Sequence, residues 1–282
     1  MRTLERMHPL CCFLYMLAVL GVTIFTRSPI LIAESALGAV LLMVVSDKGK
    51  LALLLPVIAV ISAVTNPLFS HNGVTVLFFA GDIPFTAEAV LYGALFGLML
   101  AAVSGWSISS IRYITSDKYI WLFGRILPTS GLVLSCGLRF VPLFVRRTKS
   151  FAAAQGAESL RELLRAFSSA VGYSAEEAMS SADSMKARGY GCAKRTSYSL
   201  YRLGKRESTV LFTVILLAAS AVSLMVLGGG EFYFYPALSA VGNDINDILL
   251  YIVFGVLCIL PTFAVIRENL KRRCGYSVLK EI

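Results

Sequence analysis

The chain has 282 residues, of which 57% are hydrophobic and only 15% are charged. A soluble domain is about 45–50% apolar and about 25% charged, so this chain has too few polar residues to cover a water-facing surface. The composition therefore excludes a soluble enzyme and a disordered protein, and it predicts an all-α, polytopic membrane protein. The net charge of +9 fits basic residues retained in cytoplasmic loops better than a nucleic-acid partner, which we do not expect.

Apolar stretches long enough to cross a bilayer as helices predict about six transmembrane spans. They lie near 8–26, 28–46, 50–66, 84–105, 208–228 and 246–266. If the N-terminus lies inside, every basic residue except Arg27 falls on the inner side, so both termini are predicted to be cytoplasmic. We expect N-terminal transmembrane helices over 1–105, a cytoplasmic segment over 106–207, and C-terminal transmembrane helices with a basic tail over 208–282.

The segment 106–207, between the fourth and fifth spans, has a helical pattern but is neither a span nor a polar linker. Within 132–152, apolar residues recur at three- and four-residue steps, which predicts a basic amphipathic helix that Pro142 should kink. The stripe consists of Leu134, Leu138, Val141, Val145 and Ala152. A helix of this kind could also simply lie on the anionic inner leaflet, and this alternative stays open.

A second cytoplasmic helix is predicted to begin at Ser174, because Ser174 followed by Glu177 matches a capping box. Its small and flexible apolar residues would let a partner approach closely. These residues are Ala175, Ala178, Met179, Ala182 and Met185. Gly189 can adopt the left-handed conformation that ends a helix, with Lys186 complementing the helix dipole. Arg188 has small neighbours on both sides, which favours insertion of its guanidinium into an acidic groove of a partner.

The chain lacks the usual motifs of catalysis. No GxxxxGK[ST] phosphate loop occurs, and two histidines with six cysteines lacking CxxC spacing predict neither a metal site nor a disulfide framework. We expect no cofactor. Glu34 and Glu88 are the clear ionisable residues within the spans, so a self-sufficient secondary transporter is one alternative. A membrane-bound enzyme or scaffold whose basic segment binds anionic lipid or nucleic acid is the other.

Several segments resemble one family of transport proteins. SADSMKARGYG (Ser181–Gly191), followed by KRTSY (Lys194–Tyr198), resembles the Ala-Arg-Gly coupling signature of the transmembrane T component of energy-coupling factor (ECF) transporters, the EcfT/CbiQ family. NPLFSHNGVTVLFF (Asn66–Phe79) and TAEAVLYG (Thr86–Gly93) resemble the region before the family's long cytoplasmic helices. GLRFVPLF (Gly137–Phe144) resembles the start of its first coupling helix, so the similarity covers roughly 66–200.

The resemblance implies a non-catalytic subunit of a bacterial plasma-membrane importer for a vitamin or metal ion. Such a subunit links a small substrate-binding membrane (S) subunit to two cytoplasmic ABC ATPases, which hold the ATPase activity. Carried onto this chain, Ala187, Arg188 and Gly189 would dock one ATPase. The preceding coupling-helix residues would support them: Ala182, Asp183, Ser184, Met185 and Lys186.

One departure concerns the earlier Ala-Arg-Gly that the family usually carries. The corresponding residues here are Ala154, Gln155 and Gly156, without the arginine. Contact with one ATPase would then be weaker or would use another arginine. The candidates are Arg146, Arg147, Arg161 and Arg165, and the sequence does not choose among them.

Overall fold

The computed structural model describes residues 7–46, 49–69, 74–80, 83–156, 159–192, 201, 203–234, 242 and 244–280. The predicted helical character is confirmed, with one correction: the described residues also contain a two-stranded antiparallel hairpin. Two compact units are present. Unit 1 comprises 1–115 and 202–282, and unit 2 comprises 116–201.

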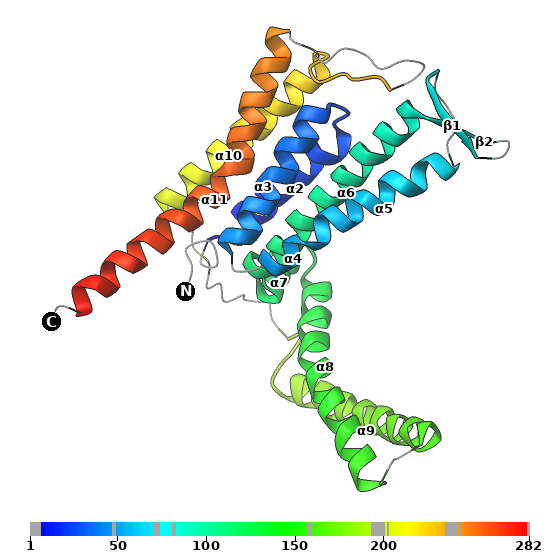
Figure 1. Ribbon diagram of the computed structural model, residues 1–282. Coiled ribbons are helices and arrows are strands. Elements are labelled where there is room, and N and C mark those ends of the chain that lie inside the picture. Colours follow the sequence, from blue (N-terminus) through cyan, green and yellow to red (C-terminus); the bar gives the residue numbers. More distant parts are fainter. Residues whose placement is uncertain are drawn as a thin grey trace. The chain divides into compact units, whose positions relative to one another are not determined.

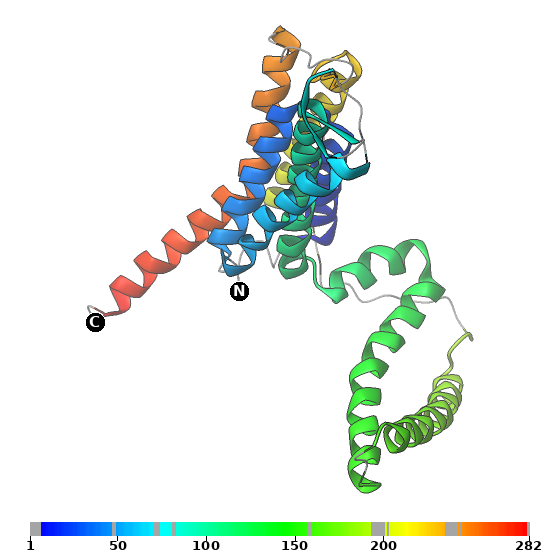
Figure 2. The same ribbon diagram turned by 45° about the vertical axis from the view of Figure 1, so that its right-hand side comes forward.

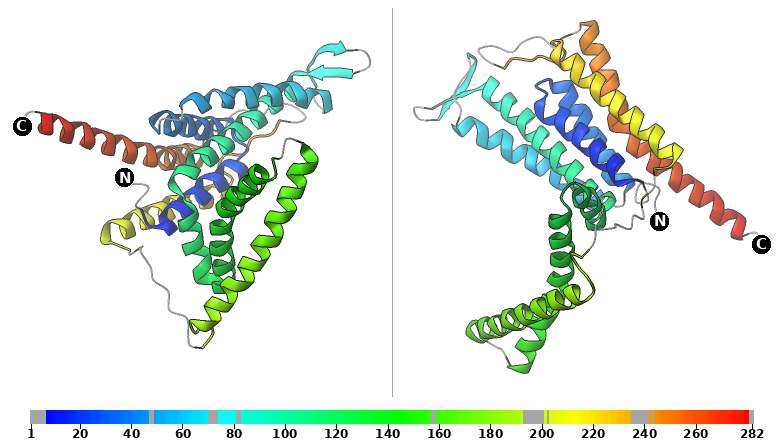
Figure 3. Two further views of the ribbon diagram at one scale, coloured as in Figure 1. Left: turned by 90° about the horizontal axis from the view of Figure 1, so that it is seen from below. Right: turned by 180° about the vertical axis from the view of Figure 1, so that it is seen from behind.

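Unit 1 is built from apolar helices that coincide with the six predicted spans (Figure 1). They are α2 (Pro9–Phe25), α3 (Pro29–Val45), α4 (Gly49–Ala52), α5 (Leu54–Phe69), α6 (Ala87–Tyr113), α10 (Lys205–Val226) and α11 (Ile245–Lys280). Helices α5 and α6 lie side by side, as do α10 and α11 (Figure 3). The third span starts later than predicted, with Pro56 in the first turn of α5, where a missing N–H breaks no intrahelical bond.

Among the described residues, four helices are long and apolar enough to cross a membrane, which makes the chain a helical membrane protein. They cover Ala87–Ile111, Thr129–Ala154, Glu207–Val226 and Ile245–Arg267. Three shorter apolar helices cover Pro9–Phe25, Pro29–Val45 and Leu54–Asn66. The structure alone therefore does not select six spans, and one of the four long helices belongs to the segment predicted to be cytoplasmic.

The predicted start of the fourth span is wrong. Its first residues belong to β2 (Ile83–Thr86), which pairs with β1 (Val76–Ala80). Thr86 then caps α6, because its Oγ1 accepts a hydrogen bond from the Ala89 N–H at 3.4 Å. The residues directly before α6 thus form a strand of a hairpin rather than the first turn of a helix.

The other end of this span also differs from the prediction, because α6 continues past residue 105 to Tyr113. Trp106 is fully buried in unit 1, and its Nε1 donates to the carbonyl oxygen of Ser35 at 3.2 Å. This contact keeps the predicted first residues of the cytoplasmic segment inside the helical bundle. The compact unit 2 begins at residue 116.

The segments on either side of the hairpin pack against each other. Asn66 on α5 donates from Nδ2 to the carbonyl oxygen of Ala89 on α6 at 2.9 Å. A Cβ atom at Gly93 would lie only 2.7 Å from the Cβ of Asn66, so glycine is required for this close approach. Two of the segments that carry the family resemblance therefore meet in space.

The described residues of unit 2 form three helices: α7 (Ser116–Ile126), α8 (Pro128–Ala154) and α9 (Leu160–Ala187). The amphipathic helix predicted over 132–152 is confirmed as part of α8, with Pro142 in its interior. Helices α7 and α8 approach closely at two glycines, since a Cβ at Gly131 would lie 2.5 Å from the Cα of Gly124.

The predicted start of the second cytoplasmic helix is wrong. Helix α9 begins at Leu160, and its capping box is formed by Ser159 and Glu162, with Glu162 Oε2 accepting from the Ser159 N–H at 3.1 Å. Ser174 instead lies inside α9, and its buried Oγ has no hydrogen-bond partner among the described residues. No proline interrupts 160–173, so the helix continues through the second capping pattern.

Candidate docking site on the paired helices of unit 2

Helices α8 and α9 follow each other in unit 2 (Figure 2), and aromatic side chains join the C-terminal half of α8 to α9. The ring centroids of Phe144 and Phe167 are 5.4 Å apart, and those of Phe151 and Tyr173 are 6.2 Å apart, both in edge-to-face geometry. Such pairs contribute about 0.5–1.5 kcal/mol beyond the burial of their area. These contacts hold the two helices against each other.

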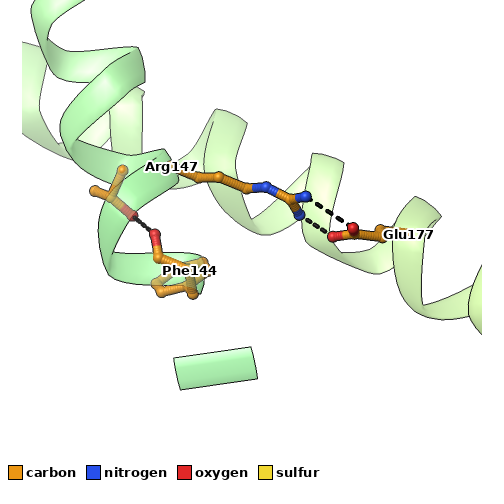
Figure 4. A network of polar contacts seen from close by, with 4 residues as sticks. Phe144, Arg147 and Glu177 are labelled. Carbon is orange, nitrogen blue, oxygen red and sulfur yellow. Dashed lines mark hydrogen bonds and ion pairs between the residues drawn. The ribbon is translucent and has the colours of Figure 1, made fainter. Parts of the chain in front are cut away.

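A charged pair lies beside these rings. The Arg147 guanidinium on α8 donates two hydrogen bonds to the carboxylate of Glu177 on α9, one of them at 2.7 Å from Nη2 to Oε1 (Figure 4). Its Cζ also lies 4.6 Å from the centre of the Tyr173 ring. Arg147 is therefore engaged within unit 2, and its part in a second docking site stays a prediction.

The two predicted apolar stripes do not form the contact between α8 and α9. On α8 the residues Leu134, Leu138, Val141 and Val145 are exposed, with Val141 at 61%. On α9 the residues Ala175, Ala178, Met179 and Ala182 are exposed, whereas Ala166 and Ala170 are fully buried. Both stripes thus remain on the surface of unit 2.

The C-terminal end of α9 has the conformation predicted from its glycine. Gly189 has φ +84°, its N–H donates to the Lys186 carbonyl at 2.9 Å, and the Tyr190 N–H donates to the Met185 carbonyl at 3.1 Å. These two bonds form a Schellman motif, which satisfies carbonyl groups at the helix end. The motif also fixes the backbone of Arg188, the last residue before the turn, at φ −82° and ψ 8°.

The side chain of Arg188 is exposed and makes no hydrogen bond or ion pair with any other described residue. Ala187 and Gly189 beside it are also exposed, as are four of the predicted supporting residues, while Met185 is half-buried. The four are Ala182, Asp183, Ser184 and Lys186. We call Ala187, Arg188 and Gly189 the arginine tip. Its exposed guanidinium is carried by a backbone that the Schellman motif holds in place. The KRTSY segment that follows it lies outside the described residues.

The C-terminal end of α8 has nearly the same backbone. Gln155 has φ −89° and ψ −1°, and Gly156 follows with φ +59° and donates its N–H to the Ala153 carbonyl at 3.3 Å. Ala154, Gln155 and Gly156, which we call the glutamine tip, are all exposed. The residues that match the degenerate family signature therefore occupy the same positions of a helix end as Ala187, Arg188 and Gly189.

The two tips lie at opposite ends of α9. This helix has 28 residues, so at a rise of 1.5 Å per residue it separates its ends by about 42 Å. Arg146, Arg161 and Arg165 are also exposed, and the structure does not select one of them as a second docking arginine. A single body that unit 2 touches at both tips would need to span about this distance.

The two carboxylates considered for secondary transport lie in different surroundings. Glu88, near the start of α6, accepts hydrogen bonds from the N–H and Oγ1 of Thr75, with 3.2 Å from the N–H to Oε1. This contact ties the hairpin to the helix, which is a structural role. Glu34 lies on α3, and its Oε2 is buried without a partner among the described residues.

Pattern reasoning missed the pairing of Arg147 with Glu177 and Tyr173. The partners are separated by 30 positions in the chain, so no local spacing could reveal it.

Comparison with known proteins adds no assignment: no protein-family model matches this chain, and no curated protein matches it.

Proposed function

We propose that this chain is the transmembrane scaffold and energy-coupling subunit of an ECF-type ABC importer that takes up a vitamin or a metal ion. The chain would be non-catalytic and would act in a bacterial plasma membrane, with two cytoplasmic ABC ATPases and a small substrate-binding membrane subunit as partners. The observation that carries the proposal is the arginine tip, an exposed guanidinium held at a helix end by a Schellman motif.

The proposal treats six helices of unit 1, all but the four-residue α4, as the spans and unit 2 as cytoplasmic. Helix α8 is the least apolar of the four long candidates, and it is paired with α9 through Arg147 and Glu177. If α8 crossed the bilayer, α9 would be carried into hydrocarbon with exposed charged side chains, at a high cost in desolvation. These side chains include Arg161, Arg165, Glu176, Asp183 and Lys186.

The orientation follows from the same assignment. The start of α2 and the end of α11 lie at the same end of unit 1 (Figure 1), as an even number of crossings requires. The excess of basic residues then favours the cytoplasm for this end. Both termini would therefore be cytoplasmic, on the side where the ATPases bind.

Docking by the arginine tip follows from its chemistry. The guanidinium is always charged and can donate two parallel hydrogen bonds to one carboxylate, so it suits an acidic groove on an ATPase. The small side chain of Ala187 and the absent one of Gly189 leave room for the groove walls. The glutamine tip, at the other end of α9, would meet the second ATPase with a neutral side chain.

In energy coupling, unit 2 would transmit the conformational change of the two ATPases to the spans. The ATPases open and close with their nucleotide state, and the coupling helices must bind these states differently to transmit work. The aromatic contacts and the pair of Arg147 with Glu177 make α8 and α9 respond together. A displacement imposed at the arginine tip or the glutamine tip would then be transmitted to the spans. The substrate-binding subunit would change its orientation in response.

The test is co-purification from the native membrane in mild detergent, followed by mass spectrometry. Wild type should bring two ABC ATPases and a small membrane protein. In Arg188→Glu, recovery of the ATPases should fall by at least about tenfold, because truncating a buried charge pair at an interface already costs about 2–5 kcal/mol. Membrane insertion of the variant should be unchanged.

Arg139→Glu is the matched control, because it makes the same charge reversal at an exposed arginine of α8 that lies outside both tips. It should retain the ATPases. Equal loss in both variants would contradict specific docking by Arg188. If the chain is purified alone and mediates ion-driven flux in liposomes without ATPases, the proposal is wrong and a secondary transporter is indicated.

A further inference from the structure

Helices α3, α5 and α6 meet at one level of unit 1 and separate beyond it (Figure 1). A Cβ atom at Gly105 of α6 would lie 3.0 Å from the Cβ of Ala39 on α3 and 3.2 Å from Cδ1 of Leu55 on α5, so the three helices converge there. Toward the start of α6, an apolar groove of about 530 Å³ opens between them. Small side chains leave this space, and they are Ala59 and Ala63 on α5 and Ala94 on α6.

The groove reaches about halfway across a membrane. Leu98, its last lining residue on α6, follows the start of that helix at Ala87 by eleven residues, about 16 Å at 1.5 Å per residue. The hydrocarbon core is about 30 Å thick. Pro29, the first residue of α3, and Phe232 also line the groove, and Phe232 is only 6% exposed. The groove therefore matches the depth of one leaflet, and the convergence at Gly105 lies beyond its inner end.

Two charged side chains lie at the mouth of the groove, next to Pro29 and Phe232 in the chain. The segments that carry them meet, because a Cβ at Gly230 would lie 3.7 Å from the Cβ of Ser28. Arg27 and Glu231 are both exposed, and they form no ion pair with each other. Glu231 accepts a hydrogen bond from the Tyr233 hydroxyl at 3.0 Å. This bond raises the pKa of Tyr233 and the charge of Arg27 opposes the rise, so the guanidinium acts on the same hydroxyl.

We infer that this groove, with Arg27 and Glu231 at its mouth, binds one phospholipid whose headgroup carries both a phosphate and an amine. We call it the lipid groove. An acyl chain would fill the apolar part down to Leu98. The guanidinium would donate two hydrogen bonds to the phosphate, and the carboxylate would accept one from the ammonium. The inference rests on the proposed function only for the leaflet, which the proposed orientation makes the outer one.

Other occupants fit the lipid groove less well. A partner helix has to cross the whole core, and the groove gives it room over only half of that path. A free phosphate ion fits the arginine but leaves the apolar part empty. An anionic lipid without an amine would place its phosphate beside Glu231 with nothing to offset the repulsion. The nearby Asp247 does not change this balance, because it is 5% exposed and accepts from the Gly230 N–H at 2.6 Å.

The test is native mass spectrometry of the detergent-purified full chain, titrated with palmitoyl-oleoyl phosphatidylethanolamine or with phosphatidylglycerol of the same acyl chains. One phosphatidylethanolamine should bind, at least about threefold more tightly than phosphatidylglycerol. Ala94→Phe, which fills the lipid groove, should weaken this binding by at least about tenfold. Ala219→Phe, at an exposed alanine of α10, is the matched control and should leave it unchanged.

The headgroup contact is tested by Arg27→Gln, which should weaken binding of phosphatidylethanolamine about fivefold. Arg139→Gln, the same exchange at an exposed arginine of unit 2, should have no effect. Equal affinity for the two lipids, or binding that ignores Ala94→Phe or Arg27→Gln, would overturn the inference.

A second measurement uses no groove-filling variant, so it decides the question even if Ala94→Phe fails to fold. A photo-crosslinking phenylalanine derivative replaces Val60, a lining residue that is 62% exposed, and the full chain is irradiated in its native membrane. The adduct should be a phospholipid. A protein adduct would show that a partner occupies the groove and would overturn the inference. Neither readout needs an ATPase, so failure here is distinguishable from failure of the role of Arg188.

Discussion

The glutamine tip and the arginine tip have the same backbone but different chemistry. Each ends a long helix with alanine, a residue near φ −85°, and a glycine with positive φ: +59° at Gly156 and +84° at Gly189. The side chain between alanine and glycine is a neutral amide in one tip and a guanidinium in the other. Backbone shape and side-chain charge can therefore be varied separately at these two sites, so variants can test which of them a partner requires.

Exchanging the two side chains is the sharpest way to test this comparison. Arg188→Gln makes the tips chemically alike; because a hydrogen bond to a charged group contributes about 1.5–3 kcal/mol, affinity for the ATPases should fall about 10- to 100-fold. Adding Gln155→Arg to this variant should raise its affinity for the ATPases again by about tenfold. The measurement is a binding titration of the detergent-purified chain with its ATPases.

Gln155→Ala is the control, and it should change the affinity by less than about threefold, because a neutral exposed amide contributes little. If it weakened binding as much as Arg188→Gln, charge would not distinguish the tips. If Gln155→Arg had no effect, the glutamine tip would not contact an ATPase.

The next largest effect concerns the glycines. An L-residue in the left-handed region costs about 1–2 kcal/mol, so Gly189→Ala should loosen the end of α9. The rate of hydrogen exchange at the Tyr190 amide, which donates to the Met185 carbonyl, should rise about tenfold. Gly156→Ala should cost less, because φ +59° lies at the centre of the left-handed region.

Gly189→Asn should recover part of the protection, because asparagine tolerates this conformation better than alanine does. Measurement is by hydrogen exchange with mass spectrometry on the purified chain. Unchanged exchange in Gly189→Ala would mean that the Schellman motif does not hold the arginine tip.

The smallest predicted effect lies between the tips, at the pair that joins their helices. Glu177 is 37% exposed and Arg147 is 22% exposed, so solvent screening limits Glu177→Gln to about 0.5–1 kcal/mol. Amide exchange in the middle of α9 should rise two- to fivefold at about that cost. Glu176→Gln, which changes an exposed neighbour without this pairing, should leave exchange unchanged; an equal rise in both variants would refute the role of the pair.

The fold was predictable from sequence where it depends on local composition. The apolar stretches coincide with α2, α3, α5, α6, α10 and α11, because the length of an apolar run sets whether a helix can cross a bilayer. The choice between two capping patterns was not predictable. Ser159 and Ser174 both precede a glutamate by three positions, and only the continuous packing of α9 on α8 shows that the helix begins at the first.

The sequence by itself determined the membrane character of this protein and the glycine-ended helix at Gly189, since both follow from neighbouring residues and their backbone freedom. The tertiary structure alone decided which side chains meet across long separations. Arg147 paired with Glu177, Trp106 donating to Ser35, and the Glu34 carboxyl beside Gly255 each join residues of different helices that are 30 or more positions apart in the chain. Local spacing carries no record of such contacts, because helix packing selects them from many compatible partners.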